Sequence, residues 1–328
     1  MEYNQFLDDV KKCIEWKVDD DYDVKINRIM KNNSVELDGV VFFKNGDNIS
    51  PNIYLNPYYD RYQNGESVEV IANEIIKIYY SAMHEQGTES YNIQFSFADM
   101  NSFIIYRLVN YSKNKKLLEG VPHIRFLDLA ITFHCLVKHD EDGIGTVRIT
   151  QEHMQGWKTS VRELMRLASV NTPKHFPIRI RNMDEVIREI LKKDIFEMFD
   201  RYDVRFGEDK DIEDIEQSAN DSLSRMLAES KSEQEMPMYI MTNANGINGA
   251  SVLLYQDAMK NFAIEKNCDF YVLPSSIHEI ILVPYQERLD RDTLTNMVLD
   301  VNRTQVPVEE ILSNKVYLYK RDTNSFEF

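Results

Sequence analysis

The sequence predicts an α+β protein with antiparallel or mixed sheets, helices packed on one face of them, and two domains. Segments with apolar residues three and four positions apart, typical of amphipathic helices, alternate with segments of period two, typical of strands. Side chains that cap helices precede several of the helical segments. Apolar residues make up 43% of the 328 residues, enough for packed cores, and about 150 residues per domain gives two domains.

Two β-hairpins are expected in the first part of the chain. Residues 23–43 alternate apolar and polar side chains and are broken at Lys31-Asn32-Asn33, where a turn is favoured. Residues 129–137 place Leu129, Ile131, Phe133, Cys135 and Val137 on one face, and the turn at 140–143 leads into a second strand at 146–149.

Five helices are expected around these hairpins. Apolar spacing predicts a helix over residues 3–17 and another that follows Ser67. Residues 97–110 are predicted as a helix, although their β-branched and aromatic side chains would also suit a strand. The last two helices begin at the capping patterns Ser160-x-x-Glu163 and Asn182-x-x-Glu185.

The C-terminal part of the chain predicts the order β, α, β, β, α, β, which suits one sheet with helices against a face. Its strands are expected at residues 237–242, 270–273, 277–283 and 316–319, and its helices at 251–266 and near Asp290. Between these parts apolar residues thin out. We therefore expect an N-terminal α+β domain at 1–205, an acidic linker or weak helix at 206–236, and a C-terminal domain at 237–328.

The charge of the chain argues against several classes of partner. There are 38 basic and 54 acidic side chains, a formal charge of −16, which disfavours direct binding to nucleic acids or to anionic membranes. No apolar run could span a bilayer, and the polar start differs from a signal peptide. Three scattered cysteines fit reduced thiols, so we expect a cytoplasmic protein with no membrane association.

Part of the acidity is concentrated in one stretch. The simpler interpretation is a solvated linker or helix face. The alternative is an acidic nucleic-acid mimic that antagonises a nucleic-acid-binding protein. The acidic residues are Glu208, Asp209, Asp211, Glu213, Asp214, Glu216 and Asp221.

The sequence contains no assembled catalytic signature. It lacks a phosphate-binding glycine loop, a nucleophile elbow and paired metal ligands, so no cofactor and no metal are expected. The weak catalytic candidates are His134 together with Ser275, Ser276 and His278, where a turn carries two hydroxyls beside an imidazole. On a strand Glu279 would point away from His278, so we favour a role for these residues in the turn itself.

Two further places could form a site. His134 shares a strand face with Thr132, so a polar pocket could lie opposite the apolar face of the 129–137 strand. Asn243, Asn245 and Asn248 stand in a turn-rich loop that could bind a small polar ligand, although asparagine is also common in left-handed turns.

Seven segments resemble an uncharacterised domain family of gut Firmicutes nearly end to end: residues 53–59, 121–130, 171–173, 181–183, 247–250, 273–279 and 305–307. A weaker likeness, through residues 157–168 and 273–283, extends to an uncharacterised Gram-positive family typified by the YtpQ protein. The resemblance implies a bacterial cytoplasmic protein, and it transfers no catalytic residues.

Together these observations favour a non-catalytic binding or regulatory protein whose partner is another protein. This hypothesis expects no deep pocket that gathers titratable groups with perturbed pKa values. The alternative, a hydrolase-like enzyme, requires Ser276 or Ser275 with His278, and perturbed groups in a cleft.

Overall fold

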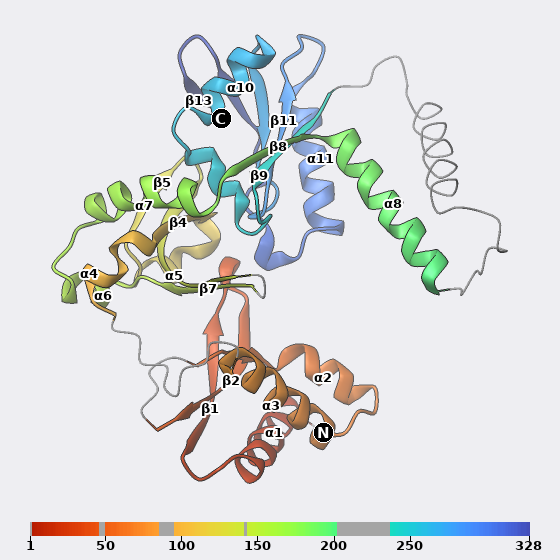
Figure 1. Ribbon diagram of the computed structural model, residues 1–328. Helices are drawn as coiled ribbons and strands as arrows, with labels where there is room; N and C mark the ends of the chain where they lie inside the picture. Colours follow the sequence, from red (N-terminus) through yellow and green to blue (C-terminus); the bar gives the residue numbers. More distant parts are fainter. Residues whose placement is uncertain (1, 46–49, 85–94, 141–142, 202–236) are drawn as a thin grey trace, which may run out of the picture. The chain divides into compact units, whose positions relative to one another are not determined.

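The computed structural model describes residues 2–45, 50–84, 95–140, 143–201 and 237–328, except the side chains of 194–201 (Figure 1). The chain forms two compact units. Unit 1 comprises Met1–Ser102 and Lys113–Val121, and unit 2 comprises Phe103–Ser112 and Pro122–Phe328. Sheets and helices are both abundant and every described strand pair is antiparallel, so the α+β class is confirmed. Among the described helices, none is both long and apolar enough to cross a membrane.

Unit 1 packs helices against a three-stranded sheet of order β1-β2-β3. The predicted hairpin is confirmed as β1 and β2, which are joined by a turn where Asn33 has a φ of 57°. Phe6 and Ile14 of α1, Phe42 of β2 and Ile75 of α3 are fully buried in one core. The elements are α1 (Tyr3–Lys17), β1 (Tyr22–Met30), β2 (Glu36–Lys44), β3 (Ile53–Tyr54), α2 (Asn56–Gln63), α3 (Val68–His84), α4 (Phe97–Met100) and α5 (Lys115–Leu118).

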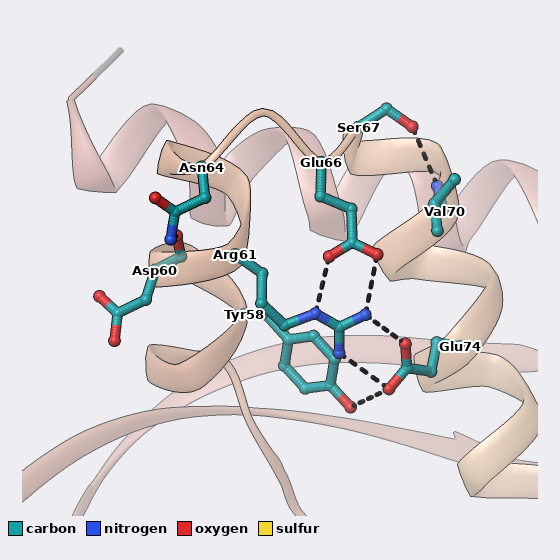
Figure 2. A network of polar contacts seen from close by, with 8 residues as sticks. All are labelled: Tyr58, Asp60, Arg61, Asn64, Glu66, Ser67, Val70 and Glu74. Carbon is teal, nitrogen blue, oxygen red and sulfur yellow. Dashed lines mark hydrogen bonds and ion pairs between the residues drawn. The ribbon is translucent and has the colours of Figure 1, made fainter. Parts of the chain in front are cut away.

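A polar network joins α2 to α3 at the surface of unit 1 (Figure 2). The guanidinium of Arg61 bonds Glu66 through Nε, at 2.7 Å, and Glu74 through Nη2, at 2.6 Å. It also lies over the ring of Tyr58, 5.1 Å from the centroid. The carboxylates of Glu66 and Glu74 face the cation, and the hydrogen bonds of Arg61 lower the pKa of both. The network therefore has a structural explanation, because it ties α2 to α3.

The first sheet of unit 2 corrects the helix predicted at 97–110. Only Phe97–Met100 is α-helical and Asn101–Phe103 is a 3-10 helix, whereas Ile104–Asn110 forms strand β4, because its β-branched and aromatic side chains pair in register with the predicted hairpin. The order is β4-β6-β5, with β7 also pairing with β6. The other strands are β5 (His123–Phe126), β6 (Leu129–Asp140) and β7 (Gly143–Arg148).

Two helices follow this sheet, α6 (Gln151–Gly156) and α7 (Val161–His175). The predicted start of α7 is confirmed, since the side chain of Ser160 accepts a hydrogen bond from the backbone N–H of Glu163. Two side chains of α7 form hydrogen bonds with backbone groups on the outer edge of β4. Thr172 Oγ1 accepts from the N–H of Tyr106 at 3.1 Å, and Asn171 Nδ2 donates to the carbonyl of Ile104 at 3.0 Å.

The second sheet of unit 2 has six strands in the order β13-β12-β10-β11-β9-β8. We expected helices on one face, but Phe262 of α10 packs on Phe270, whereas Leu294 of α11 packs on the neighbouring Tyr271, whose side chain leaves the opposite face. The elements are β8 (Ile178–Asn182), α8 (Met183–Arg201), β9 (Tyr239–Asn243), α10 (Ala258–Lys266), β10 (Phe270–Leu273), β11 (Ile280–Pro284), α11 (Arg291–Thr304), β12 (Tyr317–Lys320) and β13 (Ser325–Glu327).

The helix predicted at 251–266 is split in two. A 3-10 helix, η4 (Gly249–Leu254), is separated from α10 by Asp257, whose φ of 58° no helix can contain. The compact units also have bounds different from the domains predicted at 1–205 and 237–328, because β8 pairs with β9 from across residues 202–236. The predicted linker at 206–236 lies outside the described residues.

Candidate functional site

A row of basic side chains crosses one face of the first sheet of unit 2. Arg107 of β4 is the register partner of Thr132 of β6, and Arg148 of β7 is the partner of His134. Thr132 and His134 are two residues apart, so all four side chains leave the sheet on the same side. The pairing thus brings two arginines and a histidine together in a chain whose formal charge is −16.

Arg107 is the most unusual member of this row. Its side chain is partly exposed, but its Nε is buried and has no hydrogen-bond partner among the described residues. Burial, with a smaller contribution from the charge of Arg148, lowers the pKa of Arg107 to about 10. The guanidinium is therefore still charged at neutral pH, in a position where a buried cation normally has a carboxylate beside it.

His134 lies beside this cation and is itself 5% exposed. Its Nε2 is 3.2 Å from the hydroxyl of Thr132, while its buried Nδ1 has no partner in the described part of the chain. Burial first, and then the charges of Arg107 and Arg148, lower the pKa of His134 far below the ordinary value for histidine. The imidazole is therefore neutral at neutral pH.

This shift makes stability depend on pH. In the unfolded chain His134 titrates near pH 6.5, whereas the folded protein resists its protonation, so unfolding takes up a proton below about pH 6.5. Acidification below that value should lower the free energy of unfolding by up to about 1.4 kcal/mol per pH unit. Urea unfolding at pH 7, 6 and 5 should show a shallower slope for His134→Gln than for the wild type. His139→Gln, at an exposed position, is the control variant. Equal slopes for the wild type and His134→Gln would contradict the assignment of this pH dependence to His134.

A small pocket lies beside Arg107, between the outer edge of β4, the end of α7 and the loop after β9. It encloses about 270 Å³ of empty space, open solvent included, with room for about one water molecule at its centre. Its lining includes Ser251, which is 3% exposed and whose Oγ has no hydrogen-bond partner among the described residues. Polar lining residues are Arg107, Thr172, Asn243, Asn248 and Ser251.

The loop that closes this pocket is held by its own polar groups. Asn243 Nδ2 donates to the carbonyl of Ile247 at 2.9 Å, and Asn243 Oδ1 accepts from the N–H of Asn245 at 3.1 Å. Asn248 has a φ of 51°, which asparagine tolerates well. Of the three predicted ligand-binding asparagines, Asn243 and Asn248 line the pocket, while Asn245 is exposed and lies 3.4 Å from His139 Nε2.

The predicted catalytic residues adjoin this loop and have structural partners. His278 Nδ1 accepts the N–H of Asn248 at 3.3 Å, and its Nε2 is 3.4 Å from Glu310 Oε1. Ser276 Oγ accepts the backbone N–H of His278 at 3.0 Å and forms no hydrogen bond with the imidazole within the described residues. Both imidazole nitrogens are thus engaged elsewhere, and Ser276 serves the turn.

The remaining candidates are placed as follows. Ser275 is 8% exposed, and its carbonyl accepts the N–H of Leu312 at 2.8 Å. His134 belongs to the basic row, whereas Ser276 and His278 belong to the adjoining turn and do not line the pocket. No three histidine, cysteine or acidic side chains of the described residues come together as metal ligands would.

Sequence reasoning missed the two arginines and Ser251. Arg107 was missed because its segment was predicted as a helix. In a strand, the side chains of Ile105, Arg107 and Val109 lie on one face, and those of Ile104, Tyr106 and Leu108 lie on the other. Reading that alternation would have placed Arg107 opposite the central hairpin. No local signal joins Ser251 to β4, because that contact depends on the tertiary fold.

The fold and site define the class of this protein, an α+β protein in which two partly exposed arginines and the buried His134 form a row beside an asparagine-rich loop. Residues 3–321 match a family model described as a family of unknown function (DUF5688). The chain therefore belongs to that family, which confirms the predicted likeness to an uncharacterised family. No curated protein and no solved structure matches the chain.

Proposed function

We propose that the protein is a non-catalytic binding protein of the bacterial cytoplasm, and that a small ligand enters the pocket between β4 and the loop after β9. One observation carries this proposal: Arg107 and Ser251 line the same pocket, and the Nε of Arg107 and the Oγ of Ser251 are buried without a hydrogen-bond partner among the described residues. Leaving such a group unsatisfied costs about 1 to 3 kcal/mol. A ligand that bonds both groups would recover that energy.

The shifted pKa values of Arg107 and His134 bear on the choice between a binding protein and an enzyme. We expected no pocket with titratable groups of shifted pKa, but Arg107 lines one and His134 lies next to Arg107. Shifts of this kind mark functional sites more often than chance. Neither group adjoins a described nucleophile with a base, so the shifts support binding in preference to catalysis.

The partner protein expected from the sequence has one observation in its favour. Ile247, at the tip of the loop, lines the pocket and is 41% exposed. A ligand that fills the pocket would contact Ile247 and so change an apolar surface that a protein partner can recognise. We therefore propose a regulatory role in which the ligand controls that contact. Three free cysteines support a reducing cytoplasm as its location.

The two other hypotheses stay predictions. A hydrolase would require His278 to exchange its bonds to Asn248 and Glu310 for one to Ser276. The acidic mimic depends on residues 208–221, which lie outside the described residues.

NMR screening of the full chain against small polar fragments tests the proposal. We expect fragments to bind the wild type, and to bind at least about tenfold more weakly to Ser251→Leu, which fills the pocket. Ser325→Leu, at an exposed position of β13 that does not line the pocket, is the matched control and should bind like the wild type. Ser251→Val adds less volume and replaces the leucine variant if that one does not fold. Fragments that bind all three chains equally, or none, would overturn the proposal.

A further inference from the structure

We infer that the group bound in this pocket is an oxyanion, a phosphate or carboxylate at the end of a small molecule, held by Arg107 and Ser251. The inference rests on the proposed function, because it names the ligand class of the same pocket. Charge, hydrogen-bonding capacity and size each support it.

The charge around the pocket is positive in an acidic protein. The charges that act on Arg107 and His134 are those of arginines, and no carboxylate contributes to either pKa shift. Elsewhere in unit 2 the pattern is the reverse, since Arg166 bonds Glu163 at 2.8 Å and Lys320 bonds Asp269 at 2.7 Å. Arg107 differs from these paired cations because its Nε is buried without a partner among the described residues, and an anionic ligand would complete it.

The vacant polar atoms are donors. The Nε of Arg107 can only donate, and a guanidinium offers its N–H groups as a fork that fits two oxygens of one carboxylate or phosphate. Ser251 can donate its hydroxyl hydrogen, since its Oγ has no partner in the described part of the chain. Asn248 also lines the pocket. A cation would find no carboxylate here, whereas an oxyanion would find a charged donor and a neutral one.

The size of the cavity limits what can enter. It has room for about one water molecule, so one oxygen of the oxyanion can replace that water while the rest of the ligand stays at the mouth. At the mouth the ligand would meet Ile247, Ile144 and Phe176, which also line the pocket. The structure therefore fits a small molecule with one oxyanion and an apolar or neutral body.

Calorimetric titration of the full chain with inorganic phosphate, sulfate and acetate, at constant ionic strength set with chloride, tests this inference. We expect at least one of these anions to bind the wild type and to lose about tenfold or more in affinity in Arg107→Gln. Arg107→Lys keeps the charge but not the fork, so its affinity should be intermediate. Ser251→Ala should also weaken binding. Phosphate binding without acetate binding assigns a phosphoryl ligand, and the converse assigns a carboxylate.

Arg125→Gln is the matched control. Arg125 is the register partner of Ala130 on the same sheet face, is exposed, and lies over the ring of Tyr111 at 4.8 Å, away from the pocket lining. Its loss removes one charge and should change affinity less than about twofold. Equal losses in Arg107→Gln and Arg125→Gln, or no anion binding at all, would overturn the inference. If neutral fragments still bound in a manner sensitive to Ser251→Leu, the proposed function would stand without it.

Discussion

Gly249→Ala is expected to destabilise unit 2 by about 3 kcal/mol or more, because a Cβ has no space at this position. An added Cβ would lie 2.0 Å from Thr242 Oγ1 and 2.4 Å from the carbonyl oxygen of His278. The Thr242 hydroxyl could rotate away only by breaking its 2.7 Å hydrogen bond to the carbonyl of His278. The carbonyl oxygen of His278 belongs to the backbone, so the loop after β9 and the turn that contains His278 would have to separate.

Denaturant unfolding of the full chain, followed by circular dichroism, measures this loss. Gly156→Ala is the matched control, because nothing lies within 4 Å of a Cβ there and alanine suits the end of α6. It should be neutral or slightly stabilising. A Gly249→Ala protein within about 1 kcal/mol of the wild type would show that the loop moves apart from the turn at little cost.

The elements that the sequence predicted are those with a strong local pattern. The helix expected at residues 3–17 is α1, and the hairpin expected at 23–43 is β1 and β2. Ser160 caps α7, and Asn182 Oδ1 accepts the N–H of Asp184 at the start of α8. In each case the signal is a periodicity or a cap that is complete within a few residues.

The errors occurred where tertiary pairing decides the structure. Residues 104–110 have a composition compatible with a helix or a strand, and pairing with β6 selects the strand. Strand β8 was missed because Ile178 and Ile180 are each 40% exposed at a sheet edge, which weakens the alternating pattern. Its pairing with β9 joins residues from both sides of the predicted linker in one sheet.

The candidate site was predictable in parts only. The shared face of Thr132 and His134 follows from the alternation of a strand, and a hydrogen bond of 3.2 Å joins them. The role of the asparagine loop as the wall of a pocket could not be predicted, because it depends on the contact between β4 and η4. The polar environment around Ser276 and His278 is likewise set by Asn248 and Glu310, which come from other parts of the chain.

Arg107→Met is expected to make the ligand-free protein more stable while abolishing anion binding. Arg107 places a charge in a desolvated position without a carboxylate, and methionine fills a similar volume without that electrostatic cost. Replacing buried charges with apolar side chains is often stabilising, and here we expect about 1 to 2 kcal/mol in the free energy of unfolding. A residue retained for structure would behave oppositely, because its removal would destabilise the fold.

Thermal unfolding with and without phosphate separates these cases. In chloride alone Arg107→Met should melt a few degrees above the wild type, since 1 kcal/mol corresponds to about 2 to 4 °C at this chain length. Saturating phosphate should raise the melting temperature of the wild type, because a ligand that binds only the folded state stabilises it, and should leave the variant unchanged. Arg125→Met, at an exposed site, should shift neither value appreciably. A variant that melts below the wild type in chloride would show that Arg107 stabilises the fold. A residue kept for binding lowers the stability of the ligand-free protein, so its replacement should raise the melting temperature.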